Sequence, residues 1–370
     1  MTPSYDIISD TSNVPVAVAV SGGRDSLLAL VLAQRHYASV IAVHAFFQPP
    51  NASLRQTADA LSLQCAQRGI PFHAVDLSRE FERNVVQPFT TSYAAGQTPN
   101  PCALCNRTMK FGLLMDVAAS LGAERLVTGH YARLALHTQW GTVLQRGDDE
   151  KKEQSYFLTL VPPERLARAV FPLADWHKVN VGPELDTMGL VPPVAAESRE
   201  ICFVPGDDYR AFLTKRKVRL SGPGDIVLSD GTILGKHQGL WRHTIGQRKG
   251  LGVAYSEPLY VLGKDIARNR LVVGIKSQLQ ATTCHAVDVN LLVDPAHWPQ
   301  RVAAQTCYRQ KPRPASVVWA DGRLSLTFEE PVTRPTPGQI AAVYTLEGTA
   351  LAGGRVVEWQ VEPTEARLIG

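Results

Sequence analysis

The chain has 370 residues, of which 45% are hydrophobic and 19% charged, and its formal net charge is +4. This length predicts two or three domains, and the composition is typical of a soluble globular protein. No apolar run approaches the roughly 20 residues of a membrane-spanning helix, and the N-terminal residues lack the pattern of a secretory signal. We therefore expect a cytoplasmic protein with no membrane partner. The mild charge allows a nucleic-acid partner without requiring one.

The first half of the chain alternates two kinds of hydrophobic pattern. Strand patterns lie at 14–20, 39–47, 71–77 and 124–129, and helical patterns at 26–36, 54–69, 79–95 and 110–122. Strands that alternate with helices pair in parallel through right-handed crossovers. The sequence therefore predicts an α/β domain with a doubly wound, mostly parallel sheet over roughly residues 10–200.

From about residue 206 the pattern changes to short apolar runs separated by turn residues. The stretch SGPGDIVLSDGTILG (221–235) is of this kind, and the alternating run RLSLTF (323–328) follows the hairpin dipeptide Asp321-Gly322. We expect a catalytic domain at 1–205, a small linking domain at 206–275 and a C-terminal antiparallel β-barrel at 276–370.

The sequence SGGRDS (21–26) stands between the first strand pattern and the first helical pattern. Two glycines allow a tight turn whose N–H groups converge, and the helix N-terminus adds partial positive charge, which suits a phosphate. Ser21 and Ser26 add hydroxyl groups, and Asp25 can hold Mg²⁺. The plainer alternative is a Gly-Gly turn that serves only as a helix cap.

The six cysteines are too sparse to staple a secreted domain. One pair is a CxxC, formed by Cys102 and Cys105 in TPNPCALCNRTMKFG (98–112). In a reducing compartment such a pair is more often reactive or metal-binding than structural. The pair alone leaves open a zinc site, a redox disulfide and sulfur chemistry.

Several motifs together carry a resemblance to a known family. SGGxDS after the first strand resembles the PP-loop of the ATP pyrophosphatases, which cleave ATP between the α- and β-phosphates and adenylate a substrate carbonyl. The further motifs follow in order: TPNPCALCNRTMKFG (98–112), VTGHYAR (127–133), EQSYFL (153–158), SREICFV (198–204), HTIGQRKGLGVA (243–254) and YVLGKD (260–265). This series resembles the tRNA-specific 2-thiouridylases, which exchange oxygen for sulfur at C2 of the wobble uridine (U34).

The resemblance implies a reaction and a set of site residues. ATP, with Mg²⁺ at Asp25, would adenylate the C2 oxygen, and sulfur would then come from a cysteine persulfide, with Cys105 as the catalytic thiol and Cys202 as the persulfide carrier. The implied nucleotide site is Ser21, Gly22, Gly23, Asp25, Ser26, Ala45 and Gly129. The implied tRNA contacts are Asn100, Pro101, Lys152, Glu153, Gln154, Arg248, Lys249, Cys307 and Tyr308. The implied partners are tRNAs of the Glu, Gln and Lys type and a persulfide donor such as a cysteine desulfurase or a sulfur relay protein.

This chain departs from the commonest family pattern at several positions. Cys102 stands where many members have aspartate, Arg24 where valine is usual, and Cys307 where arginine is commoner, and the stretch 44–56 is shorter. Cys102 leaves a second chemistry open, since Cys102, Cys105 and Cys202 could hold a 4Fe–4S cluster with one iron free to bind sulfide. Structural zinc is disfavoured because it takes four ligands. A third alternative is a Cys102 that only packs.

Three basic runs lie in the non-catalytic half, at 214–220, 241–250 and 307–313, two of them with aromatic residues. A positive surface with stacking rings suits a folded RNA. These runs favour tRNA over the alternative functions, which are ATP-dependent thiolation of a small nucleobase or metabolite and a non-catalytic RNA-binding role. His130 follows a strand end, where it either meets a ligand or structures the turn.

Overall fold

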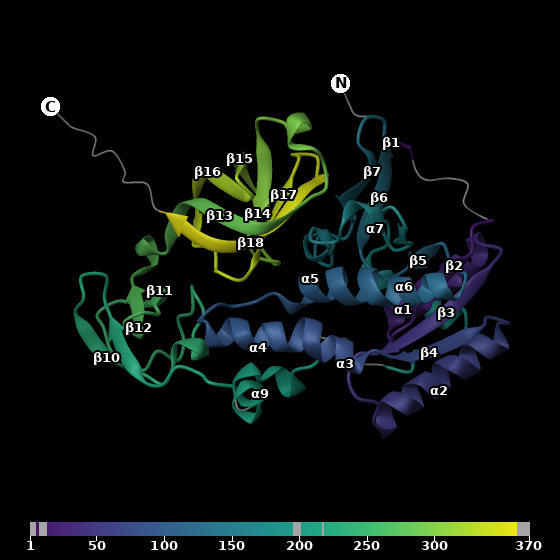
Figure 1. The fold of residues 1–370 in the computed structure, drawn as a ribbon, viewed down its shortest axis with the longest axis horizontal. Helices are drawn as coiled ribbons and strands as arrows, with labels where there is room; N and C mark the ends of the chain where they lie inside the picture. Colours follow the sequence, from purple (N-terminus) through teal and green to yellow (C-terminus); the bar gives the residue numbers. More distant parts are fainter. Residues whose placement is uncertain (1–4, 7–12, 195–200, 217, 361–370) are drawn as a thin grey trace.

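The computed structural model describes residues 5–6, 13–194, 201–216 and 218–360. Figure 1 shows three parts: an α/β part, a small sheet (β9–β12) and a barrel (β13–β18). None of the helices in these described ranges combines the length and apolar composition that a bilayer crossing requires.

The α/β part is built on a five-stranded parallel sheet, which confirms the predicted fold class. Its strands occur in the order β4 (Phe72–Asp76), β3 (Val40–Phe46), β2 (Val16–Ala19), β5 (Arg125–Val127) and β8 (Ala169–Val170). The chain moves outward from β2 to β4 and then returns to the other side of β2 with β5. Loops at the carboxyl ends of β2 and β5 therefore flank the crevice where ligands of such sheets bind.

Helices cover both faces of this sheet. α1 (Arg24–His36) buries Leu27 to Ala33, and it packs with α8 (Lys178–Thr187), whereas α2 (Ala52–Gln67) covers β3 and β4. The remaining α-helices are α3 (Ser78–Phe81), α4 (Gln87–Ala94), α5 (Pro101–Cys105), α6 (Met115–Ser120), α7 (Pro163–Leu166) and α9 (Tyr209–Lys215).

Two predicted helices are interrupted by π-helical stretches. The helix expected at 79–95 contains a π-helix at Glu82–Val86, and that expected at 110–122 begins inside a π-helix at Asn106–Leu114. Gly112 has non-helical angles (φ −92°, ψ −106°) in the second stretch, because its lack of a side chain permits that local deviation. A second difference is a small sheet that the sequence patterns did not predict, with β1 (Tyr5–Asp6), β6 (Ala132–His137) and β7 (Gly141–Arg146).

The middle of the chain forms a four-stranded sheet. Its order is β10 (Ile233–His237), β9 (Gly224–Val227), β12 (Arg270–Gly274) and β11 (Tyr260–Asp265), and β12 runs parallel to β9. Val261, Leu271 and Val273 belong to its own small apolar core.

The C-terminal part is a closed six-stranded antiparallel barrel, as predicted. Its order is β13 (Gln280–Leu291), β16 (Arg323–Thr333), β15 (Arg313–Ala320), β14 (Val302–Gln305), β17 (Ile340–Tyr344) and β18 (Ala350–Gln360). The expected hairpin joins β15 to β16, with positive φ at both Asp321 (50°) and Gly322 (73°). Alternation along β17 splits its side chains between two cores: Ala341 and Val343 pack in the barrel, and Ile340, Ala342 and Tyr344 pack in the core of the α/β part.

Candidate active site

The predicted phosphate loop lies where β2 ends and α1 begins. Gly22 has φ +88°, and a Cβ there would lie 2.7 Å from Thr57 Cγ2, so the position requires glycine. Ser26 Oγ accepts from the Ser21 N–H (3.1 Å) and donates to the Gly23 carbonyl (2.9 Å), which closes the loop. α1 begins at Arg24 after Gly23, which supplies no side-chain cap to the first-turn N–H groups. This arrangement fits an anion such as a phosphate.

Asp25 is held by two residues that the sequence patterns did not single out. Its carboxylate accepts from Lys178 Nζ at 2.7 and 2.8 Å and from the Tyr131 hydroxyl at 2.7 Å. Since an ammonium group engages both carboxylate oxygens, this arrangement does not fit a directly bound Mg²⁺, and we assign no step to the metal. Tyr131 could have been identified from the sequence because it lies in the motif VTGHYAR, whereas Lys178 lies outside all of the family motifs.

The loop after β5 packs directly on the first turn of α1. A Cβ on Gly129 would lie 2.8 Å from the carbonyl carbon and oxygen of Asp25. Helix backbone occupies the space that a side chain at position 129 would fill, so this contact alone favours glycine there. Ala45, also predicted for the nucleotide site, is half-buried in β3, which pairs with β2.

His130 links this loop to the cysteine loop. It is buried, its Nδ1 lies 2.7 Å from Thr128 Oγ1, and its Nε2 lies 3.4 Å from Lys110 Nζ. Burial first, and the Lys110 charge second, hold the pKa of His130 well below its usual value. The imidazole is therefore neutral at neutral pH.

The helix α5 presents Cys102 and Cys105 one turn apart. Asn100 caps this helix by accepting from the Ala103 N–H (3.1 Å), and Pro101 occupies its first position. Cys102 is exposed and Cys105 is buried. The structure thus gives Asn100 and Pro101, both predicted tRNA contacts, a local role in setting the cysteine pair.

Cys202 comes close enough to this pair to affect it electrostatically. Residues 198–200 of its motif lie outside the described residues, but Cys202 itself is exposed, and its carbonyl accepts from Gln48 Nε2 (3.0 Å). Burial raises the pKa of Cys105 to about 12, and the charges of Cys202 and Cys102 also raise it, whereas Lys110 lowers it. Cys102 and Cys202 are exposed at the surface, but desolvation by the surrounding protein still raises the pKa values of both thiols, whereas Lys110 lowers them.

The three thiols are free in this conformation. Within the ranges that the structure describes, no three His, Cys, Asp or Glu side chains are placed to hold a metal ion. As arranged, Cys102, Cys105 and Cys202 therefore do not fit an iron–sulfur cluster, and no step is assigned to one. Burial and the raised pKa keep the Cys105 thiol protonated at neutral pH, whereas the thiolate is the reactive form; we call this arrangement of Cys105 the resting arrangement.

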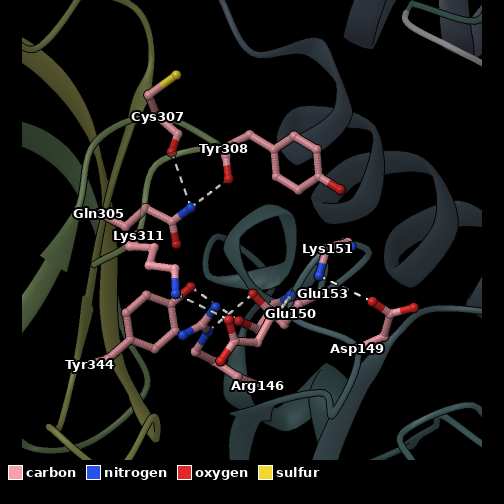
Figure 2. A network of polar contacts seen from close by, with 11 residues as sticks. Arg146, Asp149, Glu150, Lys151, Glu153, Gln305, Cys307, Tyr308, Lys311 and Tyr344 are labelled. Atoms are coloured by element: carbon pink, nitrogen blue, oxygen red, sulfur yellow. Dashed lines mark hydrogen bonds and ion pairs between the residues drawn. The ribbon is translucent and has the colours of Figure 1, made fainter. Parts of the chain in front are cut away.

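Glu153, a predicted tRNA residue of EQSYFL, lies at the contact between the α/β part and the barrel (Figure 2). Glu153 is buried, where it accepts from Arg146 Nε (3.3 Å) and from the Ser155 N–H. Gln154 Oε1 accepts from the Tyr131 N–H (3.1 Å), and Lys152 is half-buried. Glu153 and Gln154 thus stabilise the loop in this conformation.

The barrel places its predicted residues across from that loop. Gln305 Nε2 donates to the carbonyls of Cys307 (3.0 Å) and Tyr308 (2.7 Å), as Figure 2 shows. Cys307 is exposed, and the Tyr308 ring lies 4.3 Å from that of Phe157.

The other predicted basic residues lie in exposed positions. Lys311 reaches Glu150 (3.3 Å) across the contact between the α/β part and the barrel, and Arg248 and Lys249 lie in a turn of the middle part. The 214–220 run borders a cavity of about 640 Å³ lined in part by Arg210, Lys215 and Arg242, although residue 217 lies outside the described residues.

Comparison with protein families gives three consecutive matches. Residues 14–206 match the tRNA methyl transferase HUP domain, residues 210–275 the tRNA methyl transferase PRC-barrel domain, and residues 281–357 the aminomethyltransferase beta-barrel domain. A solved structure, the U34-tRNA thiolase NcsA from Methanococcus maripaludis with its 4Fe–4S cluster, is 16% identical over 56% of this chain and 66% of its own, with a TM-score of 0.36. This similarity is too low to support any inference about this chain.

Similar proteins cover nearly the whole chain. The tRNA-specific 2-thiouridylase MnmA of Nitratidesulfovibrio vulgaris (strain Miyazaki F) is 54% identical over 92% of this chain and 99% of its own length. The proteins of the same name from Oleidesulfovibrio alaskensis and Lawsonia intracellularis are 51% and 44% identical, each over 92% of this chain and 98% of their own. The chain therefore belongs to the family of the tRNA-specific 2-thiouridylases.

Proposed function

We propose that this protein is an ATP-dependent tRNA-uridine 2-sulfurtransferase, which adenylates the C2 oxygen of the wobble uridine and then transfers sulfur from a persulfide on Cys202. The observation that carries this proposal is the loop after β5. In this loop, Gly129 packs on the first turn of α1 and Tyr131 donates a hydrogen bond to Asp25. His130 lies beside Lys110, whose charge lowers the pKa of all three cysteines. These contacts connect the phosphate loop to the cysteine loop through the loop after β5.

The nucleotide half of the reaction uses the loop at 21–26. ATP supplies the phosphate ester that turns the uridine C2 oxygen, otherwise a poor leaving group, into a good one. The first-turn N–H groups of α1 and the Ser21 hydroxyl bind its phosphates, and Gly22 allows the turn that aims them. Lys178 and Tyr131 fix the Asp25 carboxylate beside this site.

The sulfur half uses two thiols. The terminal sulfur of a Cys202 persulfide attacks C2, and the activated oxygen leaves with AMP. The Cys105 thiolate then attacks the Cys202 sulfur, the bond to the transferred sulfur breaks, and its electron pair forms the C2=S bond. A Cys105–Cys202 disulfide remains, and an external dithiol must supply two electrons to reset the enzyme.

The substrate and partners follow from the surface and the family. The exposed Arg248, Lys249 and Lys311 suit the phosphates of a folded tRNA. Relatives named for tRNA thiolation support that substrate, and they give the small-metabolite alternative no support. We extend the proposal to tRNAs of the Glu, Gln and Lys type, to a cysteine desulfurase or relay protein as donor, and to domains at 1–205, 206–275 and 276–370.

Single cysteine variants test the sulfur half. Cys105→Ser and Cys202→Ser should each abolish 2-thiouridine formation, measured by mass spectrometry of tRNA nucleosides, because each removes one of the two sulfur atoms that the transfer requires. Cys105→Ser should still release AMP when tRNA is added. Cys102→Ser is the matched control one turn away, and we expect it to keep most activity in air. Thiolation by Cys105→Ser at the wild-type rate would contradict the mechanism.

A further inference from the structure

The residues 96–100, which we call the lead-in segment, join α4 to the cysteine helix α5 (Figure 1). The segment has no regular secondary structure, yet every residue in it is half-buried. Its main-chain groups are therefore expected to find partners elsewhere in the protein. They find them in both of the other parts of the molecule.

The barrel holds the middle of the lead-in segment. The Thr98 N–H donates to the Pro337 carbonyl (2.9 Å), and Gln339 Nε2 donates to the carbonyls of Thr98 (2.9 Å) and Pro99 (3.3 Å). A Cβ on Gly338 would lie 2.9–3.1 Å from the Thr98 backbone, so the two chain segments are in direct contact.

Residues 337–339, which contact the lead-in segment, are themselves fixed to the barrel. The Gly338 N–H donates to the Val356 carbonyl (2.9 Å), and the Val356 N–H donates to the Gln339 carbonyl (2.8 Å). The next residue, Ile340, also ties the barrel to the α/β part, because the buried Tyr156 hydroxyl of that part donates to the Ile340 carbonyl (3.0 Å) and accepts from its N–H (3.2 Å). A shift of the barrel would therefore move the lead-in segment with it.

The four-stranded sheet holds the other end of the segment. Lys264 on β11 donates from Nζ to the Gly96 carbonyl (2.7 Å), and the Ile266 side chain packs where a Gly96 side chain would stand. Burial of Lys264 lowers its pKa to about 8, which is consistent with a side chain enclosed at a contact between domains. The lead-in segment is thus held from both parts that carry the basic runs, and it ends at Asn100, the cap of the cysteine helix.

We infer that Lys264 and Gln339 are positioning residues for Cys105, through which tRNA bound to the middle sheet and the barrel sets the place of the cysteine helix. This inference rests on the proposed function, since it takes Cys105 as the reacting thiol. In the resting arrangement Cys105 is buried and protonated. Engagement of tRNA by the two outer parts would pull the lead-in segment and expose the thiol.

The test compares Gln339→Ala and Lys264→Met with wild type. We expect kcat for tRNA thiolation to fall about tenfold in each, the usual size of coupling between two sites, while KM for tRNA stays within about twofold. Lys264→Arg should keep activity because it keeps a donor. Gln280→Ala and Lys276→Met, at exposed positions outside the segment, are matched controls and should be unchanged.

A second readout follows the thiol itself. Alkylation of Cys105, measured by peptide mass spectrometry, should become faster in wild type when tRNA is added and should lose this response in Gln339→Ala and Lys264→Met. Wild-type kcat and a wild-type alkylation response in both variants would overturn the inference, as would an effect on KM alone. If Gln339→Ala unfolds below the assay temperature, the kcat and the alkylation response of Lys264→Met alone test the inference. A wild-type protein that makes no thiouridine refutes the proposed function, but the alkylation response still tests the positioning role.

Discussion

Lys110 is the residue whose charge acts on the whole cysteine group. Its ammonium favours the thiolate at Cys102, Cys105 and Cys202, whereas burial opposes the thiolate at each. Lys110→Met should therefore raise the pKa of Cys105 further and slow its alkylation at any fixed pH below that pKa. The measurement is the pH profile of alkylation, with Lys110→Arg as the control that keeps the charge. An unchanged profile in Lys110→Met would show that the lysine does not tune the thiol.

The sequence could predict the residues that carry motifs and not those that assist them. The glycines and serines of SGGRDS and the cysteines of the CxxC have few structural substitutes, so their spacing alone pointed to phosphate and sulfur chemistry. Lys178 lies outside the motifs, and Lys110 lies inside TPNPCALCNRTMKFG, but the sequence assigned a role to neither lysine. They became site residues only when the fold brought Lys178 to within 2.7 Å of Asp25, more than a hundred residues earlier in the chain.

At the scale of elements, the loop after β5 packs directly on the first turn of α1. Gly129→Ala should destabilise the protein by about 1–3 kcal/mol, because its Cβ would lie 2.8 Å from helix backbone, which cannot move aside easily. Chemical denaturation measures this difference. Gly222→Ala is the matched control, since a Cβ there meets nothing within 4 Å. Equal losses of stability in the two variants would show that the contact is loose.

The sequence predicted strands and turns correctly where the hydrophobic pattern matches the burial seen in the structure. The strands near 14–20 and 39–47 lie inside the parallel sheet and are largely buried, so their continuous apolar runs predicted them. Asp321-Gly322 predicted its hairpin through local backbone preference. The π-helical stretches were not predictable, because a π-helix has no separate hydrophobic period to read. The pair β6 and β7 was missed, since part of its buried surface packs on the distant barrel strands.

At the scale of the whole molecule, the proposed tRNA surface extends over the parts outside the α/β domain. Replacing Arg248, Lys249 and Lys311 with methionine should flatten the dependence of log affinity on log salt, by roughly one unit for each phosphate that the protein no longer neutralises. Lys311 should contribute least, because its ammonium already pairs with Glu150. Binding titrations at several salt concentrations measure the slope, with Lys236→Met as an exposed control. A wild-type slope in the triple variant would assign these residues to plain solvated surface.

The proposed reaction predicts that nucleotide cleavage and sulfur transfer depend on each other through tRNA. The most direct test incubates the purified protein with ATP, unmodified tRNA, a persulfide donor and an external dithiol, and follows AMP and 2-thiouridine together. We predict that AMP appears only when tRNA is present, that 2-thiouridine forms at the wobble position in equal amount, and that Asp25→Ala produces neither while still binding tRNA. Thiouridine formed without ATP, or full turnover by Asp25→Ala, would contradict the account.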